Sequence, residues 1–214
     1  MLRVGLTGGL AAGKSVVAQI FSEMGAKVMQ ADLVARELMA PGKAVYHDVV
    51  RHFGTEILDV DGSINRPKLA KMVFGGSRVH ELNEIVHPAV IQSQEEWMAE
   101  IESSEPEAVA IVEAALIFEA GVARRFEKLI VVTAPEELRI ERFVQRSLPP
   151  GENSPVRVAE LRAEAKRRLA AQIPEAEKIT AADYVIDNSG SLSATRQQAQ
   201  RVYHHLERLA RSKS

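Results

Sequence analysis

Residues 8–15 read Gly8-Gly9-Leu10-Ala11-Ala12-Gly13-Lys14-Ser15, which satisfies the pattern G-x-x-x-x-G-K-S/T. The apolar residues 2–7 before it have the length and composition of a buried strand. Residues 15–21 after it have the apolar spacing of a helix. A strand, a glycine-rich turn and a helix are the context in which this pattern forms a phosphate-binding loop. The sequence therefore predicts a binding site for a nucleoside triphosphate.

The chemistry of such a loop comes from its backbone, whose curled N–H groups point at a phosphate beside a partially positive helix N-terminus. We expect Lys14 to reach the β- and γ-phosphates and the Ser15 hydroxyl to ligate Mg²⁺. Because a Cβ restricts positive φ, we also expect the loop to curl without a positive φ at Ala11. The residues predicted to contact the nucleotide here are Gly9, Leu10, Ala11, Ala12, Gly13, Lys14, Ser15 and Val16.

Composition sets limits on the class of protein. The 214 residues are 46% hydrophobic, which is enough for a sizeable core, and the net charge of −2 argues against non-specific nucleic-acid binding. The absence of cysteine excludes disulfides, cysteine-ligated zinc and thiol catalysis. No apolar run approaches the roughly 18 residues of a membrane span. We expect a cytoplasmic protein, a monomer or weak homo-oligomer, that contacts neither nucleic acid nor membrane.

The apolar runs predict an α/β fold. Four more runs of strand length occur at residues 27–30, 108–112, 129–132 and 184–186. About five short apolar strands separated by helices are typical of a parallel sheet covered by helices on both faces. With the loop after the first strand, this pattern predicts a P-loop NTPase core with about five parallel strands.

Long helical stretches interrupt this core. Residues 33–107 show no strand pattern, although a strand–helix–strand crossover needs only about 30 residues. We expect a helical insert at the C-terminal edge of the sheet, where open α/β sheets bind ligands, with plain packing helices as the alternative. The expected organisation is a core of residues 1–34, 105–138 and 180–214, an insert of 35–104 and a lid of 139–179.

The lid prediction depends on a row of arginines. Arg139, Arg142 and Arg146 follow one another at i, i+3 and i+7 and share one helix face. Such a face favours a flap that closes over polyphosphate, with a solvated helix surface as the alternative. The turn-rich residues 148–155 predict an exposed loop between two helices.

Asp32 follows the second predicted strand directly. The carboxyl ends of parallel strands share one edge of a sheet, so this carboxylate is expected near the phosphate loop. It could accept a proton from an attacking hydroxyl or hold Mg²⁺ through water. It could equally cap the following helix, because Asp is a preferred N-cap. Residues 59–62 match D-x-x-G but are predicted to be a plain turn.

Besides the phosphate loop, the chain contains Ala31-Asp32, His87-Pro88 and Ile186-Asp187-Asn188. Together these motifs resemble the dephospho-coenzyme A kinase family. The resemblance extends over nearly the whole chain. The phosphate loop is generic, whereas Ala31-Asp32, His87-Pro88 and Ile186-Asp187-Asn188 are more specific to the family. It implies an ATP-dependent kinase that phosphorylates the ribose 3′-hydroxyl of dephospho-coenzyme A, the final step of coenzyme A biosynthesis.

The resemblance also implies roles for single residues. Asp32 would be the general base, with Lys14 and the lid residue Arg142 as further catalytic groups. Further expected nucleotide contacts are Arg146 and Asn188, and expected acceptor contacts are Thr7, Asp32, Arg66 and His87. Gln30 stands where the family often has an aspartate, which leaves Asp32 as the only carboxylate of that pair. A kinase for another small alcohol and a nucleotide-binding regulator remain as alternatives.

Overall fold

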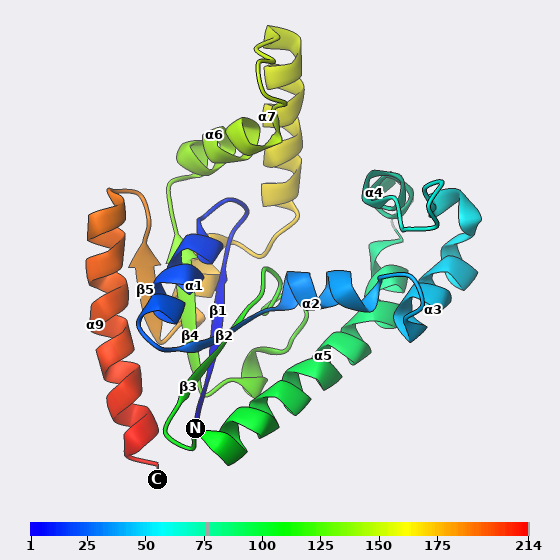
Figure 1. Ribbon diagram of the computed structural model, residues 1–214. Coiled ribbons are helices and arrows are strands. Elements are labelled where there is room, and N and C mark those ends of the chain that lie inside the picture. Colours follow the sequence, from blue (N-terminus) through cyan, green and yellow to red (C-terminus); the bar gives the residue numbers. More distant parts are fainter. Residues whose placement is uncertain (76–77, 214) are drawn as a thin grey trace. The chain divides into compact units, whose positions relative to one another are not determined.

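The computed structural model describes residues 1–75 and 78–213, and the chain divides into two compact units. One unit comprises Met1–Met29 together with Ile101–Ser214, and the other comprises Gln30–Glu100 (Figure 1). Residues 139–179, the expected lid, group with the first unit. No helix among the described residues is both long and apolar enough to cross a bilayer.

A five-stranded sheet forms the centre of the first unit, with the strand order β2-β3-β1-β4-β5. The pairs β1–β3, β1–β4 and β4–β5 are parallel. Leu6 of β1 lies opposite Glu113 of β3 on one side and Ile130 of β4 on the other. The predicted α/β fold is confirmed. The strands are β1 (Leu2–Gly8), β2 (Lys27–Gln30), β3 (Val109–Glu113), β4 (Lys128–Thr133) and β5 (Tyr184–Asp187).

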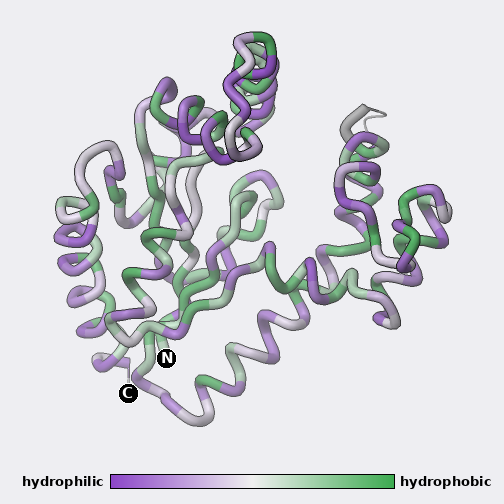
Figure 2. Tube along the Cα trace, turned by 45° about the horizontal axis from the view of Figure 1, so that its top comes forward, coloured by the Kyte–Doolittle hydropathy of each residue, from purple (hydrophilic) through white to green (hydrophobic). Residues whose placement is uncertain are grey.

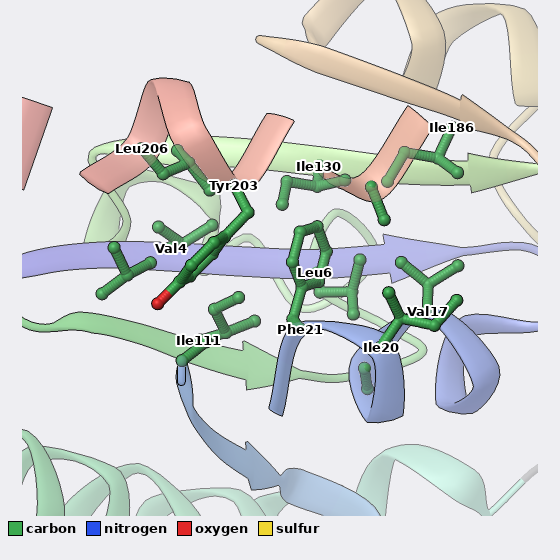
Figure 3. Packing of buried hydrophobic residues seen from close by; sticks show 14 of the residues in the cluster. Val4, Leu6, Val17, Ile20, Phe21, Ile111, Ile130, Ile186, Tyr203 and Leu206 are labelled. Atoms are coloured by element: carbon green, nitrogen blue, oxygen red, sulfur yellow. The ribbon is translucent and has the colours of Figure 1, made fainter. Parts of the chain in front are cut away.

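Two helices, α1 (Lys14–Glu23) and α9 (Leu192–Arg211), pack their buried side chains against one face of this sheet. Phe21 of α1 and Leu206 of α9 are fully buried beside the strand residues Val4 and Ile130 (Figure 3). Along these helices, hydrophobic residues recur between hydrophilic ones, as expected of amphipathic helices that cover a sheet (Figure 2). This packing fixes the strand–loop–helix segment that carries residues 8–15.

The expected lid is helical and broken where turn residues predict a break. The helix α6 (Glu136–Ser147) ends before the loop, and α7 (Pro155–Ala170) begins with proline at its first turn. A second break separates α7 from α8 (Glu175–Ala181). The 3₁₀ turn η2 (Ala123–Arg125) precedes β4.

The second unit is helical, as the sequence predicts for this stretch. Its elements are α2 (Ala31–Leu38), α3 (Ala44–Phe53), the 3₁₀ turn η1 (Thr55–Ile57), α4 (Arg66–Gly75) and most of α5 (Val79–Ser104). Residues 59–62 form a turn closed by the backbone bond from Gly62 N to Asp59 O, beside an isolated bridge between Leu58 and Ile64. The prediction of a plain turn there is confirmed.

Candidate active site

The predicted phosphate loop connects β1 to α1 and is shaped by two close approaches. A Cβ at Gly8 would overlap the carbonyl oxygen of Val132, so only glycine fits against β4 there. Gly13 is the N-cap of α1 with φ of 96°, and a Cβ there would overlap Nδ2 of Asn188. The N–H of Ala12 donates to Gly9 O at 3.2 Å, which closes the curl. The glycines thus permit both the turn and its contacts.

Ala11 departs from the sequence prediction. Its φ is 54°, the only left-handed φ of a non-glycine residue in the described part of the chain. The expectation that the loop avoids a positive φ at this position is therefore wrong. The physical reason lies in packing: Leu10 and Ala11 contact an apolar cluster formed by α6 and α7. Contacts of Leu10 and of the Ala11 methyl group with this cluster act against a backbone cost of about 1–2 kcal/mol.

Asn188 anchors the loop from the end of β5. It is 7% exposed, and its Nδ2 donates to Ala12 O at 2.9 Å. The hydroxyl of Thr195 donates to Asn188 Oδ1 at 2.9 Å, so both ends of the amide are used. Arg142 Nη2 donates to the Asn188 carbonyl oxygen at 2.8 Å. The structure thus brings together the predicted residues Asn188 and Arg142 at the Gly13 end of the loop.

The three arginines of α6 have different environments. The Arg139 side chain is 8% exposed, and its Nη2 pairs with Glu175 Oε2 at 2.8 Å. Arg142 is partly buried, with an Nη1 that has no hydrogen-bond partner among the described residues. Arg146 is exposed. The row is therefore not a solvated surface along its whole length, because its first member is buried against the loop residue Gly9.

The other predicted residues of this unit differ in their exposure and in their hydrogen bonds. Lys14 directs its Nζ back to Gly8 O, at 3.3 Å. Ser15 and Val16 are exposed at the start of α1, where a ligand can reach them. Thr7 is fully buried in β1, and its hydroxyl faces Ala115 O at 3.4 Å.

Several neighbours of the loop were not predicted as site residues. Gln172 Oε1 accepts a hydrogen bond from Leu10 N at 3.1 Å. Lys178 is 2% exposed and pairs with Glu119 Oε1 at 2.6 Å. A cavity of about 340 Å³ lies beside Gly9 and is lined by both basic and acidic groups. Gln172 lies between the end of α7 and Pro174, the N-cap of α8, and no sequence motif marks this group. The polar lining side chains are those of Glu136, Arg139, Lys166, Gln172, Glu175 and Lys178.

Three predicted residues belong to the second unit. Asp32 lies in the first turn of α2 and is exposed; the N-cap is Gln30, so Asp32 does not cap this helix. Burial, followed by the charge of Arg36, lowers the pKa of Arg66. Burial lowers the pKa of His87, which favours its neutral form. Arg36 and Arg66 are thus near enough to repel each other, and neither has an acidic partner among residues 1–75 and 78–213.

The comparisons with known proteins agree with one another. A family model described as dephospho-CoA kinase matches residues 2–194. The chain is 37% identical over 212 residues to the dephospho-CoA kinase of Moorella thermoacetica, covering 97% of this chain and 93% of that one. It is 39% identical over 209 residues to that of Aquifex aeolicus, covering 97% and 99%.

Solved structures give the same picture. Dephospho-CoA kinase from Campylobacter jejuni is similar with a TM-score of 0.67 and 26% identity, covering 96% of both chains. A shikimate kinase from Bacteroides thetaiotaomicron, with a TM-score of 0.53 and 16% identity over 96% of this chain and 98% of that one, shares the fold. The family model matches most of the chain, and the phosphate loop has the geometry described above. The protein therefore belongs to the dephospho-CoA kinase family.

Proposed function

We propose that this protein transfers the γ-phosphoryl group of ATP to the ribose 3′-hydroxyl of dephospho-coenzyme A, giving coenzyme A and ADP. The observation that carries the proposal is the phosphate loop at residues 8–15, in a chain that matches the family over residues 2–194. The fold supports the nucleotide site, and the family match supports the identity of the acceptor.

The nucleotide would be held by the backbone N–H groups of the loop, by the N-terminus of α1 and by Lys14. The residues present also fit Mg²⁺. No group of three or more acidic or histidine side chains in the described ranges could cage a metal. An exposed Ser15 hydroxyl beside the loop suits an ion that takes most of its ligands from phosphates and water. When bound there, Mg²⁺ would neutralise charge on the β- and γ-phosphates.

Asp32 is the proposed general base. It would accept the proton of the 3′-hydroxyl as that oxygen bonds to the γ-phosphorus and the bond to the β,γ-bridging oxygen breaks, so that ADP leaves. Two observations support this role. Asp32 is exposed, and it lies in the first turn of α2 and not at the N-cap position, which Gln30 occupies.

The second unit is proposed to bind the acceptor. Arg36 and Arg66 together make a positive site without an acidic partner in the described ranges, which suits the phosphate groups of a coenzyme A precursor. His87, whose pKa is lowered by burial, can serve as a neutral hydrogen-bonding group for the same ligand. Thr7 is also proposed to contribute to the acceptor site, because it lies one residue before the end of β1, next to the phosphate loop.

The α6 helix is proposed to act as part of a lid. Arg142, fixed to the Asn188 carbonyl, would face the nucleotide at the Gly13 end of the loop. Its Nη1, which has no partner in the described part of the chain, offers a donor there. Arg146 is exposed in the last turn of α6 and would contact the nucleotide from there.

The test combines the purified protein, Mg-ATP and dephospho-coenzyme A, and detects coenzyme A by mass. The Asp32→Asn variant should bind ATP as the wild type does while kcat falls by about 10²-fold or more. Glu37→Gln, an exposed acid on the same helix, is the matched control and should leave kcat unchanged. Adenosine monophosphate phosphorylated in preference to dephospho-coenzyme A would instead identify a kinase for another alcohol. ATP bound without ADP release for any acceptor would identify a regulator.

A further inference from the structure

Two arginines one turn apart on α6 lie at opposite ends of the phosphate loop. A Cβ at Gly9 would overlap Nη1 of Arg139, so this guanidinium is packed directly on the first half of the loop. Arg142 instead has its Nη1 3.9 Å from the position of a Cβ at Gly13, in the second half. The helix therefore presents a separate cation to each half of the loop.

Lys14 shows which half faces the terminal phosphate. Its Nζ lies 3.3 Å from Gly8 O, so the side chain reaches back from α1 across the loop to its first residue. The lysine of this motif contacts the β- and γ-phosphates. The γ-phosphoryl group of a bound triphosphate would consequently lie toward Gly8 and Gly9, and this is the end of the loop where Arg139 is packed.

Arg139 is held in place but retains hydrogen-bonding capacity. Glu175 Oε2 accepts from its Nη2 at 2.8 Å, while Glu175 Oε1 accepts from the Thr133 hydroxyl at 2.6 Å. The Nε of Arg139 is fully buried and has no hydrogen-bond partner among the described residues. A buried donor without a partner is costly and rare in native proteins. The adjoining cavity of about 340 Å³ gives an anionic group room to reach this guanidinium.

We infer that Arg139 is a catalytic residue that contacts the γ-phosphoryl group, and that Glu175 is a positioning residue that orients the Arg139 guanidinium. This inference rests on the proposed function, because it assigns a role within the same reaction. As charge develops on the transferred group, a fixed guanidinium stabilises it without reorganisation. Arg142, at the other end of the loop, serves the rest of the nucleotide.

The experiment measures the dissociation constants of ATP and ADP by calorimetry, with Mg²⁺ and without acceptor. Arg139→Gln should weaken ATP binding by about tenfold or more, because a charge-assisted contact to the γ-phosphoryl is lost, and leave ADP binding unchanged. Arg142→Gln should weaken both nucleotides by similar factors. Arg157→Gln, which removes an exposed ion pair with Glu160 on α7, is the matched control and should change neither.

A purely structural role of Arg139 gives a different result. In that case Arg139→Gln would weaken ATP and ADP equally, or neither, and this outcome overturns the inference. Loss of the preference for ATP in Arg142→Gln instead of Arg139→Gln also overturns it. Should Arg139→Gln fail to fold, Arg139→Lys keeps the charge but loses the planar fork. It should still lose about threefold in ATP binding relative to ADP, and an unchanged ratio overturns the inference.

Failure of the proposed function would be recognised separately. It would appear as wild-type protein that makes no coenzyme A, whatever the nucleotide affinities of the Arg139 variants. Wild-type protein that does make coenzyme A, together with Arg139 variants whose ATP-to-ADP ratio is unchanged, would overturn only the role of Arg139.

Discussion

The side-chain amide of Asn188 donates a hydrogen bond to the backbone carbonyl oxygen of Ala12 at 2.9 Å, across 176 residues of sequence. This bond ties the residue after β5 to the centre of the phosphate loop. The Thr195 hydroxyl fixes the orientation of the amide from α9. The loop therefore depends on the last strand and the last helix of the chain for its shape.

Asn188→Ala should reduce both stability and nucleotide affinity. The change leaves Ala12 O and the Thr195 hydroxyl without this partner, which should cost about 1–3 kcal/mol of unfolding free energy. Urea unfolding measures the stability, and titration with ATP and ADP measures the affinity. Asn153→Ala, in the exposed loop between α6 and α7, is the control and should change neither. An Asn188 variant with wild-type stability would show that the bond contributes nothing to the fold.

The buried pair of Lys178 and Glu119 should be essential to stability. Lys178 is 2% exposed, so Lys178→Met leaves the Glu119 carboxylate without its cation in a site that water does not reach freely. The loss is expected to be about 3 kcal/mol or more, by urea unfolding. Adding Glu119→Gln to the same chain should restore part of this loss, since the uncompensated charge is removed. Equal stability of the single and double variants would contradict the assigned pairing.

Ala11 should be sensitive to the shape of its side chain. Ala11→Val places a β-branched residue at a φ of 54°, a conformation that such residues avoid, and is expected to destabilise the protein by about 1–2 kcal/mol. Ala163→Val, on the exposed face of α7, should cost only the small helix-propensity difference. Thermal unfolding of both variants measures the difference. Equal effects at the two positions would argue against a left-handed backbone at Ala11.

Glu81 should make the stability of the second unit depend on acidic pH. Hydrogen bonds from Arg78 and then His52 lower its pKa from the ordinary 4.5 to about 2. Because the folded value is the lower one, the stabilisation is complete above pH 4.5 and is lost as pH falls toward 2. Glu81→Gln should therefore lower the unfolding midpoint at pH 7, and its difference from wild type should shrink over that window. Glu84→Gln, on the exposed face of α5, is the control. A difference that stays constant down to pH 2 would contradict the shift.

The fold was predictable because its signals are local. Buried parallel strands are continuous apolar runs, and each of the five expected runs coincides with a strand to within one residue at either end. The loop at residues 8–15 was recognisable because its glycines are required by close approaches that only the backbone makes. The turn at 59–62 followed from its place in the helical insert, far from the end of any predicted sheet strand.

The contacts around the loop were not predictable, because they join distant segments without any periodic pattern. Arg139 and Glu175 are on different helices, and Gln172 contacts Leu10 from 162 residues away. The φ of Ala11 was mispredicted for a related reason: the residue's own preference is local, whereas the packing that overrides it comes from α6 and α7. The proposed roles of Asp32, Arg66 and His87 stay predictions that mutagenesis can address.

Leu10 and Ala11 contact the same apolar cluster that holds α6 to α7, so the loop and the helices above it share hydrocarbon surface. Any movement of these helices away from the loop would wet that surface. The hydrophobic effect weakens on cooling, so the penalty for wetting diminishes in the cold. Where such a movement limits turnover, an Arrhenius plot of product release should curve, because exposing apolar surface gives the step a heat capacity of activation. Replacing Leu10 with a polar residue should reduce this heat capacity of activation.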